Sequence, residues 1–214
     1  TLEPSVSTSL PAGWSLLATV RLGTEVVDKL EPGTPQRRGF SAISRPLDLS
    51  SRAELELREL ILVGDIGRTH IQLGKQQIVW GKSDGLKVLD VVNPQTFREF
   101  ILDDFSDSRI PLWSANAEIR LRFAELQLIW IPDPTFHELP VSGSTFEFTS
   151  PMLVPTPAPG IQTVTRSERT PRRLVRDSEA GGRLSTFYAG WDLTLNYLYH
   201  FDDLPSPRRS ISSQ

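Results

Sequence analysis

Apolar and polar residues alternate along much of this chain with the two-residue period of a β-strand. Residues 14–23 show the pattern first, with apolar side chains on one face and more polar ones on the other. Residues 115–123 and 191–201 show it most clearly, because polar and charged side chains fill most of the face opposite the apolar row. Weaker alternation predicts further strands at residues 2–10, 53–63, 69–79, 126–131 and 183–188.

Short turns and long connections follow one another along the chain. Turn residues at 11–13, 64–67, 124–125 and 188–190 predict about four hairpins. The connections between hairpins are much longer, at residues 24–52, 81–113 and 132–182. Most connections in compact domains have about 4 to 6 residues, whereas outer-membrane barrels combine short periplasmic turns with long external loops. The pattern therefore predicts an all-β, antiparallel, up-and-down transmembrane β-barrel with about eight strands in this chain and a short helix in a long loop.

A soluble β-sandwich is the alternative, because it also alternates apolar and polar positions and buries its apolar rows between two sheets. Periodicity alone does not separate the two folds. Aromatic residues at the ends of the apolar rows, such as Trp191 and Phe201, and the charge density of the polar rows favour the barrel. In a barrel the apolar rows contact lipid and the polar rows line an aqueous lumen.

Two charged residues fit this arrangement poorly. Strict alternation places Glu59 and Lys75 on the lipid side, among apolar neighbours. A lysine at the bilayer midplane costs about 2 to 4 kcal/mol. Either β-bulges near Arg58 and Gly74 turn both charges inward, or these parts of the strands lie beyond the bilayer.

Strand direction predicts that residues 1–214 form a fragment of a larger barrel. If the tight turns are periplasmic, the first strand runs inward from outside and the last one, residues 191–201, runs outward. Complete bacterial barrels normally keep both termini in the periplasm, so at least one strand is expected to be missing at each end. A single closed barrel domain of eight strands is the competing count.

Composition excludes several classes of protein. The 214 residues include 23 basic and 26 acidic side chains, a net charge of −3 without the basic excess of a nucleic-acid-binding protein. Cysteine is absent, which excludes disulfides, thiol nucleophiles and thiolate metal sites. No run approaches the roughly 18 apolar residues of a membrane-spanning helix. His70, His137 and His200 lack metal-ligand spacing and no nucleophile elbow occurs, so we expect no metal, no cofactor and no catalytic residue.

Three short motifs follow one another from the end of one predicted strand. They are LGKQQIVWG at residues 73–81, DVVNP at 90–94 and DSRIP at 107–111. Together they resemble a proteobacterial outer-membrane β-barrel family that is still labelled as a domain of unknown function and is distantly similar to alginate-export porins. The matching residues are Gly74, Lys75, Gln76, Trp80, Gly81, Asp90, Val92, Asn93, Pro94, Asp107, Arg109 and Pro111.

The resemblance extends to residues 56–60 and 190–192 and so covers most of the chain. It implies the outer membrane of a Gram-negative bacterium as the location. The partners it implies are membrane lipid, lipopolysaccharide, the barrel-assembly machinery and a periplasmic or inner-membrane transport partner. Members of the family are much longer than this chain, which agrees with the argument from strand direction.

The segment after Asn93 predicts a short helix over residues 95–102, with Asn93 as N-cap and Pro94 at the first helical position. Folded into the lumen, this helix would act as a constriction or plug. Charged side chains of the same loop either pin it by ion pairs, worth roughly 0 to 1 kcal/mol each when exposed, or contact a solute. They are Asp84, Asp90, Arg98, Asp103, Asp107 and Arg109.

Three functions remain open at this point. The first is a passive outer-membrane channel, or export or uptake porin, that selects small polar solutes by size and charge. The second is a non-conducting outer-membrane component that delivers lipid or hydrophobic ligands with a partner, its blocked lumen lined by Leu17, Leu60, Leu62 and Leu198. The third is a soluble β-sandwich binding module. For the channel, the polar rows predict a lumen lined by Arg21, Glu54, Glu56, Arg58, Glu118, Arg120, Arg122, Asp192 and Asn196.

Overall fold

The computed structural model describes residues 1–29, 32, 39–80, 90–99, 105–149 and 173–204. Within them the protein is all-β, with nine antiparallel strands in one sheet, a short helix α1 (Phe105–Ser108) and a 3-10 turn at Pro11–Gly13. The strands are β1 (Ser5–Ser9), β2 (Ser15–Thr24), β3 (Leu47–Ser50), β4 (Ala53–Ile66), β5 (Thr69–Gln76), β6 (Leu112–Arg120), β7 (Glu125–Ile131), β8 (Glu179–Tyr188) and β9 (Trp191–Tyr199). Every predicted strand is present with slightly shifted ends, and only the short β3 was not predicted.

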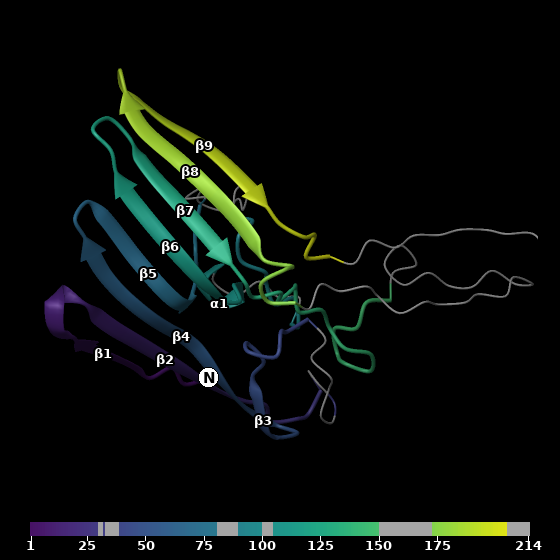
Figure 1. Ribbon diagram of the computed structural model, residues 1–214. Helices are drawn as coiled ribbons and strands as arrows, with labels where there is room; N and C mark the ends of the chain where they lie inside the picture. Colours follow the sequence, from purple (N-terminus) through teal and green to yellow (C-terminus); the bar gives the residue numbers. More distant parts are fainter. Residues whose placement is uncertain (30–31, 33–38, 81–89, 100–104, 150–172, 205–214) are drawn as a thin grey trace, which may run out of the picture.

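The sheet is built from successive hairpins (Figure 1). Its order is β1-β2-β4-β5-β6-β7-β8-β9, and β3 pairs with β4 beside this path. The predicted hairpins β1–β2, β4–β5, β6–β7 and β8–β9 are confirmed. Among the described residues β1 does not pair with β9, so the sheet is open and a closed barrel is not formed by this part of the chain.

The two ends of the sheet carry different connections. The tight turns of the hairpins gather at one end, at the upper left in Figure 1, and the long connections, with α1 and β3, lie at the other end. The β4–β5 and β8–β9 turns are two residues long, at residues 67–68 and 189–190. Gly67 and Gly190 have φ angles of 62° and 87° there, which glycine adopts without strain. The predicted asymmetry between short turns and long connections is confirmed.

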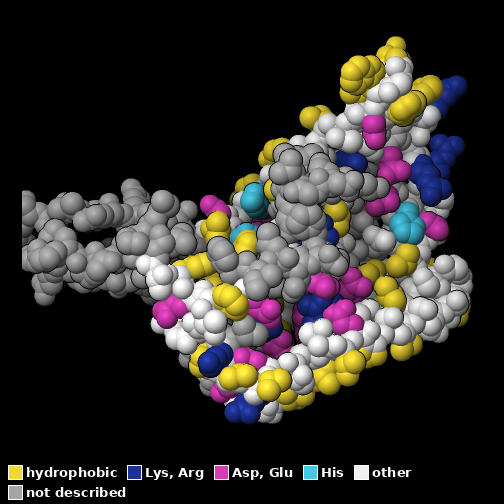
Figure 2. Space-filling view, turned by 180° about the vertical axis from the view of Figure 1, so that it is seen from behind, with side chains coloured by type: hydrophobic (Ala, Val, Ile, Leu, Met, Phe, Trp, Pro, Cys, Tyr) yellow, Lys and Arg dark blue, Asp and Glu magenta, His cyan; other side chains and the backbone are white. Residues whose placement is uncertain are grey.

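The two faces of the sheet differ in chemistry, because residues that pair across neighbouring strands point to the same side. One apolar row runs across seven strands through Leu16, Leu62, Leu73, Ala115, Trp130, Ala180 and Tyr199. Polar rows alternate with the apolar rows and point to the other side. Figure 2 shows this second side hollowed, with Lys, Arg, Asp and Glu side chains gathered in it. We call the two sides the apolar face and the concave face.

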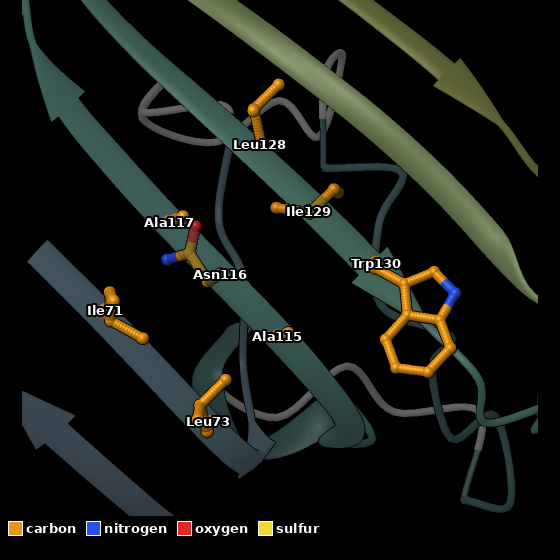
Figure 3. Close-up of a pocket in the computed structure, with 8 residues that line it drawn as sticks. All are labelled: Ile71, Leu73, Ala115, Asn116, Ala117, Leu128, Ile129 and Trp130. Atoms are coloured by element: carbon orange, nitrogen blue, oxygen red, sulfur yellow. The ribbon is translucent and has the colours of Figure 1, made fainter. Parts of the chain in front are cut away.

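The apolar face is uncovered in the described part of the chain. Leu195 and Tyr197 are each 71% exposed, and Trp191 is 69% exposed. A shallow depression of about 250 Å³ lies where Ala115 and Ala117 are flanked by larger side chains of β5 and β7 (Figure 3). Its lining contains no ionisable side chain, so it is a feature of the apolar surface and not a reaction site.

A β-bulge in β4 explains the position of Glu59. Val20 of β2 pairs with Leu57, and the preceding Thr19 pairs with Glu59. Arg58 therefore has no partner in the register, and the extra residue reverses the faces of the strand beyond it. Glu59 lies on the concave face as a result, which confirms the bulge predicted near Arg58.

Lys75 is also turned away from the apolar face. It is 1% exposed, and its Nζ lies 3.8 Å from Oε1 of Glu56, a residue of the concave face. The preceding Gly74 has a φ of 131°, which interrupts the regular pleat of β5. The register shows no bulge here, so the second predicted bulge is wrong. A glycine with an unusual backbone angle, and not an extra residue, brings the lysine inward.

The helix predicted over residues 95–102 is absent from the described part of that segment. Gln95 instead pairs with Arg109, and Thr96 pairs with Glu138, in isolated β-bridges. The last residues of the predicted helix lie outside the described residues. Backbone pairing with two other segments thus replaces the helix that the local sequence favours, and α1 forms later in the same connection.

Parts of the long connections pack on the concave face near their end of the sheet. We call these segments, residues 39–46, 77–80, 90–99, 105–111 and 132–138, the plug. A cluster of apolar side chains joins the plug to the nine-stranded sheet, which we call the wall. The cluster consists of Ile78, Trp80, Val92, Leu112, Ile129 and Ile131, and Leu198 packs against it. Gly181 makes room for this contact, because a Cβ there would lie 2.8 Å from the Trp80 ring.

Candidate functional site

A row of polar side chains crosses the concave face between the plug and the tight turns. The registers align Asp65, His70, Glu118, Gln127, Arg183 and Asn196 on six successive strands, from β4 to β9. We call these six residues the polar row. At its β4 end, Nδ1 of His70 lies 2.9 Å from Oδ1 of Asp65. The row presents hydrogen-bond donors, acceptors and charges of both signs to the hollow of the sheet.

Hydrogen bonds tie the middle of the polar row to the wall and the plug. Gln127 Nε2 donates to Asn116 Oδ1 at 3.1 Å, and Asn116 Nδ2 donates to Gln72 Oε1 at 2.8 Å. Gln127 Oε1 accepts a hydrogen bond from the indole Nε1 of Trp80 at 2.9 Å. These bonds fix the amide orientations and hold the plug against β7.

A cluster of buried charges lies on β4 and β5, where α1 docks. Glu56 Oε1 is 3.7 Å from Arg58 Nη1 and 3.8 Å from Lys75 Nζ. Arg58 Nη2 also donates to the carbonyl oxygen of Asp107 in α1 at 3.1 Å. Arg21 of β2 reaches the side chain of the same Asp107 at 3.2 Å. The buried carboxylate of Glu56 is therefore shared by two cations, Arg58 and Lys75.

Further ion pairs hold the connection between β5 and β6. Arg98 Nη1 donates to both carboxylate oxygens of Glu54 on β4, at 3.2 and 3.1 Å. Arg109 Nε donates to both oxygens of Asp90, at 3.0 and 2.8 Å. All four side chains are largely buried, so solvent screens these pairs less than exposed ones. The contacts favour the pinning role that the sequence suggested for the loop charges.

Asn93 joins two further segments of the plug. Its Oδ1 accepts a hydrogen bond from the backbone N–H of Ile78 at 2.7 Å, and its Nδ2 donates to the carbonyl oxygen of Ile110 at 2.9 Å. The residue is 2% exposed. A side chain engaged in this way is unavailable to cap a helix, which is the physical reason why the predicted N-cap is wrong.

Asp133 is a second buried centre of hydrogen bonding. Its carboxylate accepts hydrogen bonds from Ser41 Oγ at 2.5 Å, from Thr135 Oγ1 at 2.7 Å and from the backbone N–H of Trp113 at 3.1 Å. The hydroxyl of Ser44 donates to it as well. Four donors compensate the buried charge, so Asp133 joins two connections to the start of β6.

Most of the predicted lumen-lining residues share the concave face. They are Arg21, Glu54, Glu56, Glu118, Arg120, Asp192 and Asn196. Arg58 is the bulged residue, and its guanidinium lies beside Glu56. Arg122 differs from the prediction, because β6 ends at Arg120 and Arg122 stands in the following turn, 5.1 Å from the centre of the Phe123 ring.

The motif residues that the structure describes meet where the plug contacts the wall. Pro94 and Pro111 are almost fully buried beside Asn93, and Gln76 is 2% exposed. Gln76 Nε2 donates to the carbonyl oxygen of Gln72 at 3.2 Å. Gly81, Asp84 and Asp103 lie outside the described residues, so their predicted roles are not addressed. At the described positions the residues of the three motifs form the contact between the plug and the wall.

Sequence analysis missed several polar residues of the concave face. They are Gln72, Asn116, Gln127 and Arg183 on the strands, and Ser41, Ser44 and Asp133 in the connections. The residues on strands occupy alternate positions opposite the apolar rows, so the two-residue period could have found them. The residues in the connections carry no local signal, because their partners are far away in the sequence.

Asp203 is a titratable group just after β9, at the end of the sheet that carries the long connections. Burial, together with the nearby carboxylates of Glu179 and Asp202, raises the pKa of Asp203 to about 7. The backbone N–H of Phe201 donates to Glu179 Oε1 at 2.9 Å, which holds the start of β8 to the residues after β9. The carboxyl group therefore changes its charge near neutral pH.

We expect the free energy of unfolding to fall between about pH 4 and about pH 7, in part because of Asp203. The unfolded carboxyl ionises near pH 3.9, whereas the folded one keeps its proton up to about pH 7. The folded state binds more protons in this range, so stability decreases as pH rises. Asp203→Asn should remove this part of the decrease in urea unfolding curves, and Asp192→Asn, an exposed control, should not. Identical pH profiles for Asp203→Asn and the parent protein would contradict the assignment.

Within the ranges described above, no group of three or more His, Cys, Asp or Glu residues could hold a metal ion. No described helix has the length and hydropathy needed to cross a membrane. Comparison with protein-family models, with curated proteins and with solved structures found no match. The two faces of the sheet are therefore the features from which we infer function.

Proposed function

We propose that this chain forms part of the wall of an outer-membrane β-barrel that acts as a channel for the passive passage or export of small solutes. One observation carries the proposal: the same strands present an exposed apolar face on one side and a charged, hydrogen-bonding face on the other. An uncovered apolar surface of this extent is unfavourable in water. Lipid tails would cover it, while the concave face keeps its charges in an aqueous interior.

Exposure of the apolar rows favours this fold over a soluble sandwich. In a sandwich a second sheet covers the apolar side chains, but the described strands all belong to one sheet. Leu121 is 48% exposed and Leu195 is 71% exposed. Glu118 and Arg120 lie on the opposite, concave side. This distribution is the reverse of a sandwich, whose charged rows face bulk solvent.

Strand length and aromatic placement agree with a bilayer. Strands β2, β8 and β9 have 10, 10 and 9 residues, and a tilted membrane strand needs about 9 to 11. Tyr188 pairs with Trp191 at the end with tight turns, and Trp130 and Tyr199 share one row near the other end. The span from Trp191 to Tyr199 is about 27 Å along the strand. At a tilt of about 40° this corresponds to about 21 Å along the membrane normal, slightly less than the roughly 25 Å apolar band between aromatic girdles.

Among the described strands β1 and β9 stand at the two ends of the sheet, and each pairs with one neighbour only. Lipid cannot satisfy the hydrogen-bonding groups of an open sheet edge, so membrane sheets close into barrels. Within the proposed barrel both edges pair with further strands. The proposal also places the protein in the outer membrane of a Gram-negative bacterium, in contact with lipopolysaccharide and inserted by the barrel-assembly machinery.

Planar-bilayer recording of the full-length protein tests the channel. We expect discrete conductance steps after addition of folded protein, because the polar row leaves a hydrated path along the concave face. A heat-denatured sample of the same preparation serves as the control and should give none. Folded protein that inserts into lipid but carries no current would contradict the proposal.

A second candidate is the non-conducting component that delivers lipid or hydrophobic ligands with a partner. The apolar cluster of the plug, which includes Trp80, Ile129 and Leu198, favours it because it fills part of the concave face. The lining expected for this alternative is not assembled, however. Leu17 pairs with Ile61 on the concave face, whereas the bulge at Arg58 places Leu60 and Leu62 on the apolar face. Lipid retained through purification, without conductance, would support this candidate.

A further inference from the structure

Arg183 occupies a distinctive place on the concave face. It lies on β8 in the polar row, between Gln127 of β7 and Asn196 of β9. This position is away from the buried charges on β4 and β5, on the opposite part of the sheet. It is a half-buried cation in the hollow beyond the plug.

The described Lys and Arg side chains of β2, β4 and β5 on the concave face, and Arg98 of the plug, pair with carboxylates. Arg58 and Lys75 share Glu56, Arg98 pairs with Glu54, and Arg21 pairs with Glu3 and Asp107. The fields of such close pairs largely cancel a short distance away. Among the described residues no carboxylate lies within ion-pair distance of Arg183, so none of them compensates its charge.

The polar atoms around Arg183 are also unsatisfied. Its Nε is enclosed and has no hydrogen-bond partner, and the same is true of Oδ1 of its cross-strand neighbour Asn196. An enclosed polar group without a partner is costly, so such groups are rare in folded proteins. Both of these atoms belong to one register pair, on the face that carries the polar row.

We propose that Arg183, positioned beside Asn196, sets the preference of the channel for anions over cations. This inference rests on the proposed channel function. An uncompensated positive charge in a confined aqueous space raises the local concentration of anions and lowers that of cations. The neighbouring Asn196 amide supplies hydrogen-bonding capacity that helps to replace water around the ion.

Reversal potentials in a potassium chloride gradient test the inference on the full-length protein. Arg183→Gln should lower the ratio of chloride to potassium permeability by roughly sevenfold, because one charge at about 7 Å in water changes the local concentration of each ion by roughly 2.7-fold, in opposite directions. Arg183→Lys keeps the charge and should retain most of the preference. Arg122→Gln is the matched control, because it removes the same charge from the turn beside Phe123, outside the polar row. Its ratio should change much less.

The outcomes separate the two proposals. A normal conductance with a permeability ratio unchanged in Arg183→Gln would overturn the role of Arg183 and leave the channel intact. Equal shifts in Arg183→Gln and Arg122→Gln would do the same, since they would reflect overall charge and not position. Absence of conductance in the parent protein would overturn the channel and this inference together. Conductance that persists in Arg183→Gln also demonstrates that the variant folds.

Discussion

Gly74→Ala should prevent normal folding of the wall, with a loss of at least about 3 kcal/mol of stability. Gly74 has a φ of 131°, where residues with a Cβ are strained. The added Cβ would lie 1.9 Å from the carbonyl oxygen of Leu60, and a strand backbone cannot move away without breaking the β4–β5 pairing. Lys75 would lose the backbone angle that turns it toward Glu56. Urea unfolding followed by tryptophan fluorescence measures the effect.

Gly182→Ala is the matched control for this substitution. Gly182 lies in β8 on the apolar face, without a positive φ, and an added Cβ would make contacts of 3.4 Å or longer. The same chemical change should therefore leave stability nearly unaltered. Comparable losses in the two variants would show that the backbone at Gly74 has no special role, and would contradict the explanation given for the inward lysine.

Glu56→Gln should cost about 3 to 5 kcal/mol, because removing one partner of a buried ion pair leaves uncompensated charge. Glu56 Oε1 lies 3.7 Å from Arg58 Nη1 and 3.8 Å from Lys75 Nζ, and Lys75 is 1% exposed. An amide of almost the same size preserves the packing, so the loss reports the charge and not a cavity. Chemical unfolding of the purified protein in detergent gives the difference in free energy.

A double variant makes this second test specific. Glu56→Gln combined with Lys75→Met removes the buried cation along with its partner and should recover part of the lost stability. Glu125→Gln, at the exposed start of β7, makes the same amide change and should alter stability by less than about 0.5 kcal/mol. Additive losses in the double variant would contradict direct coupling between Glu56 and Lys75.

The strands could be predicted from the sequence because their signal is local. Alternation from residue to residue sets the two faces, and a two-residue turn such as that at Gly190 sets the hairpin. The alternation also revealed the conflict at Glu59, because it placed this charged residue on the lipid side, among apolar neighbours. The pattern left a bulge at Arg58 as one of two explanations, and the register of β2 with β4 decides in its favour.

The plug could not be predicted in the same way. Asp133 depends on Ser41, 92 residues away in the sequence, and Gln127 depends on Trp80, 47 residues away. No local pattern encodes such contacts, and the one local signal in the region, the N-cap at Asn93, was overridden by bonds to other segments. The residues predicted to line the lumen share the concave face where they follow the period of a strand, whereas Arg122 stands in a turn, because β6 ends at Arg120.

The order of strands has a consequence for how the molecule acquires its structure. Apart from the small β3, each strand pairs with a neighbour in the chain, so the wall can assemble by successive local closures, each with a modest entropic cost. The contacts of Asp133 span far longer stretches and require strands that are already in place. The nine-stranded sheet can therefore form before the plug packs on its concave face.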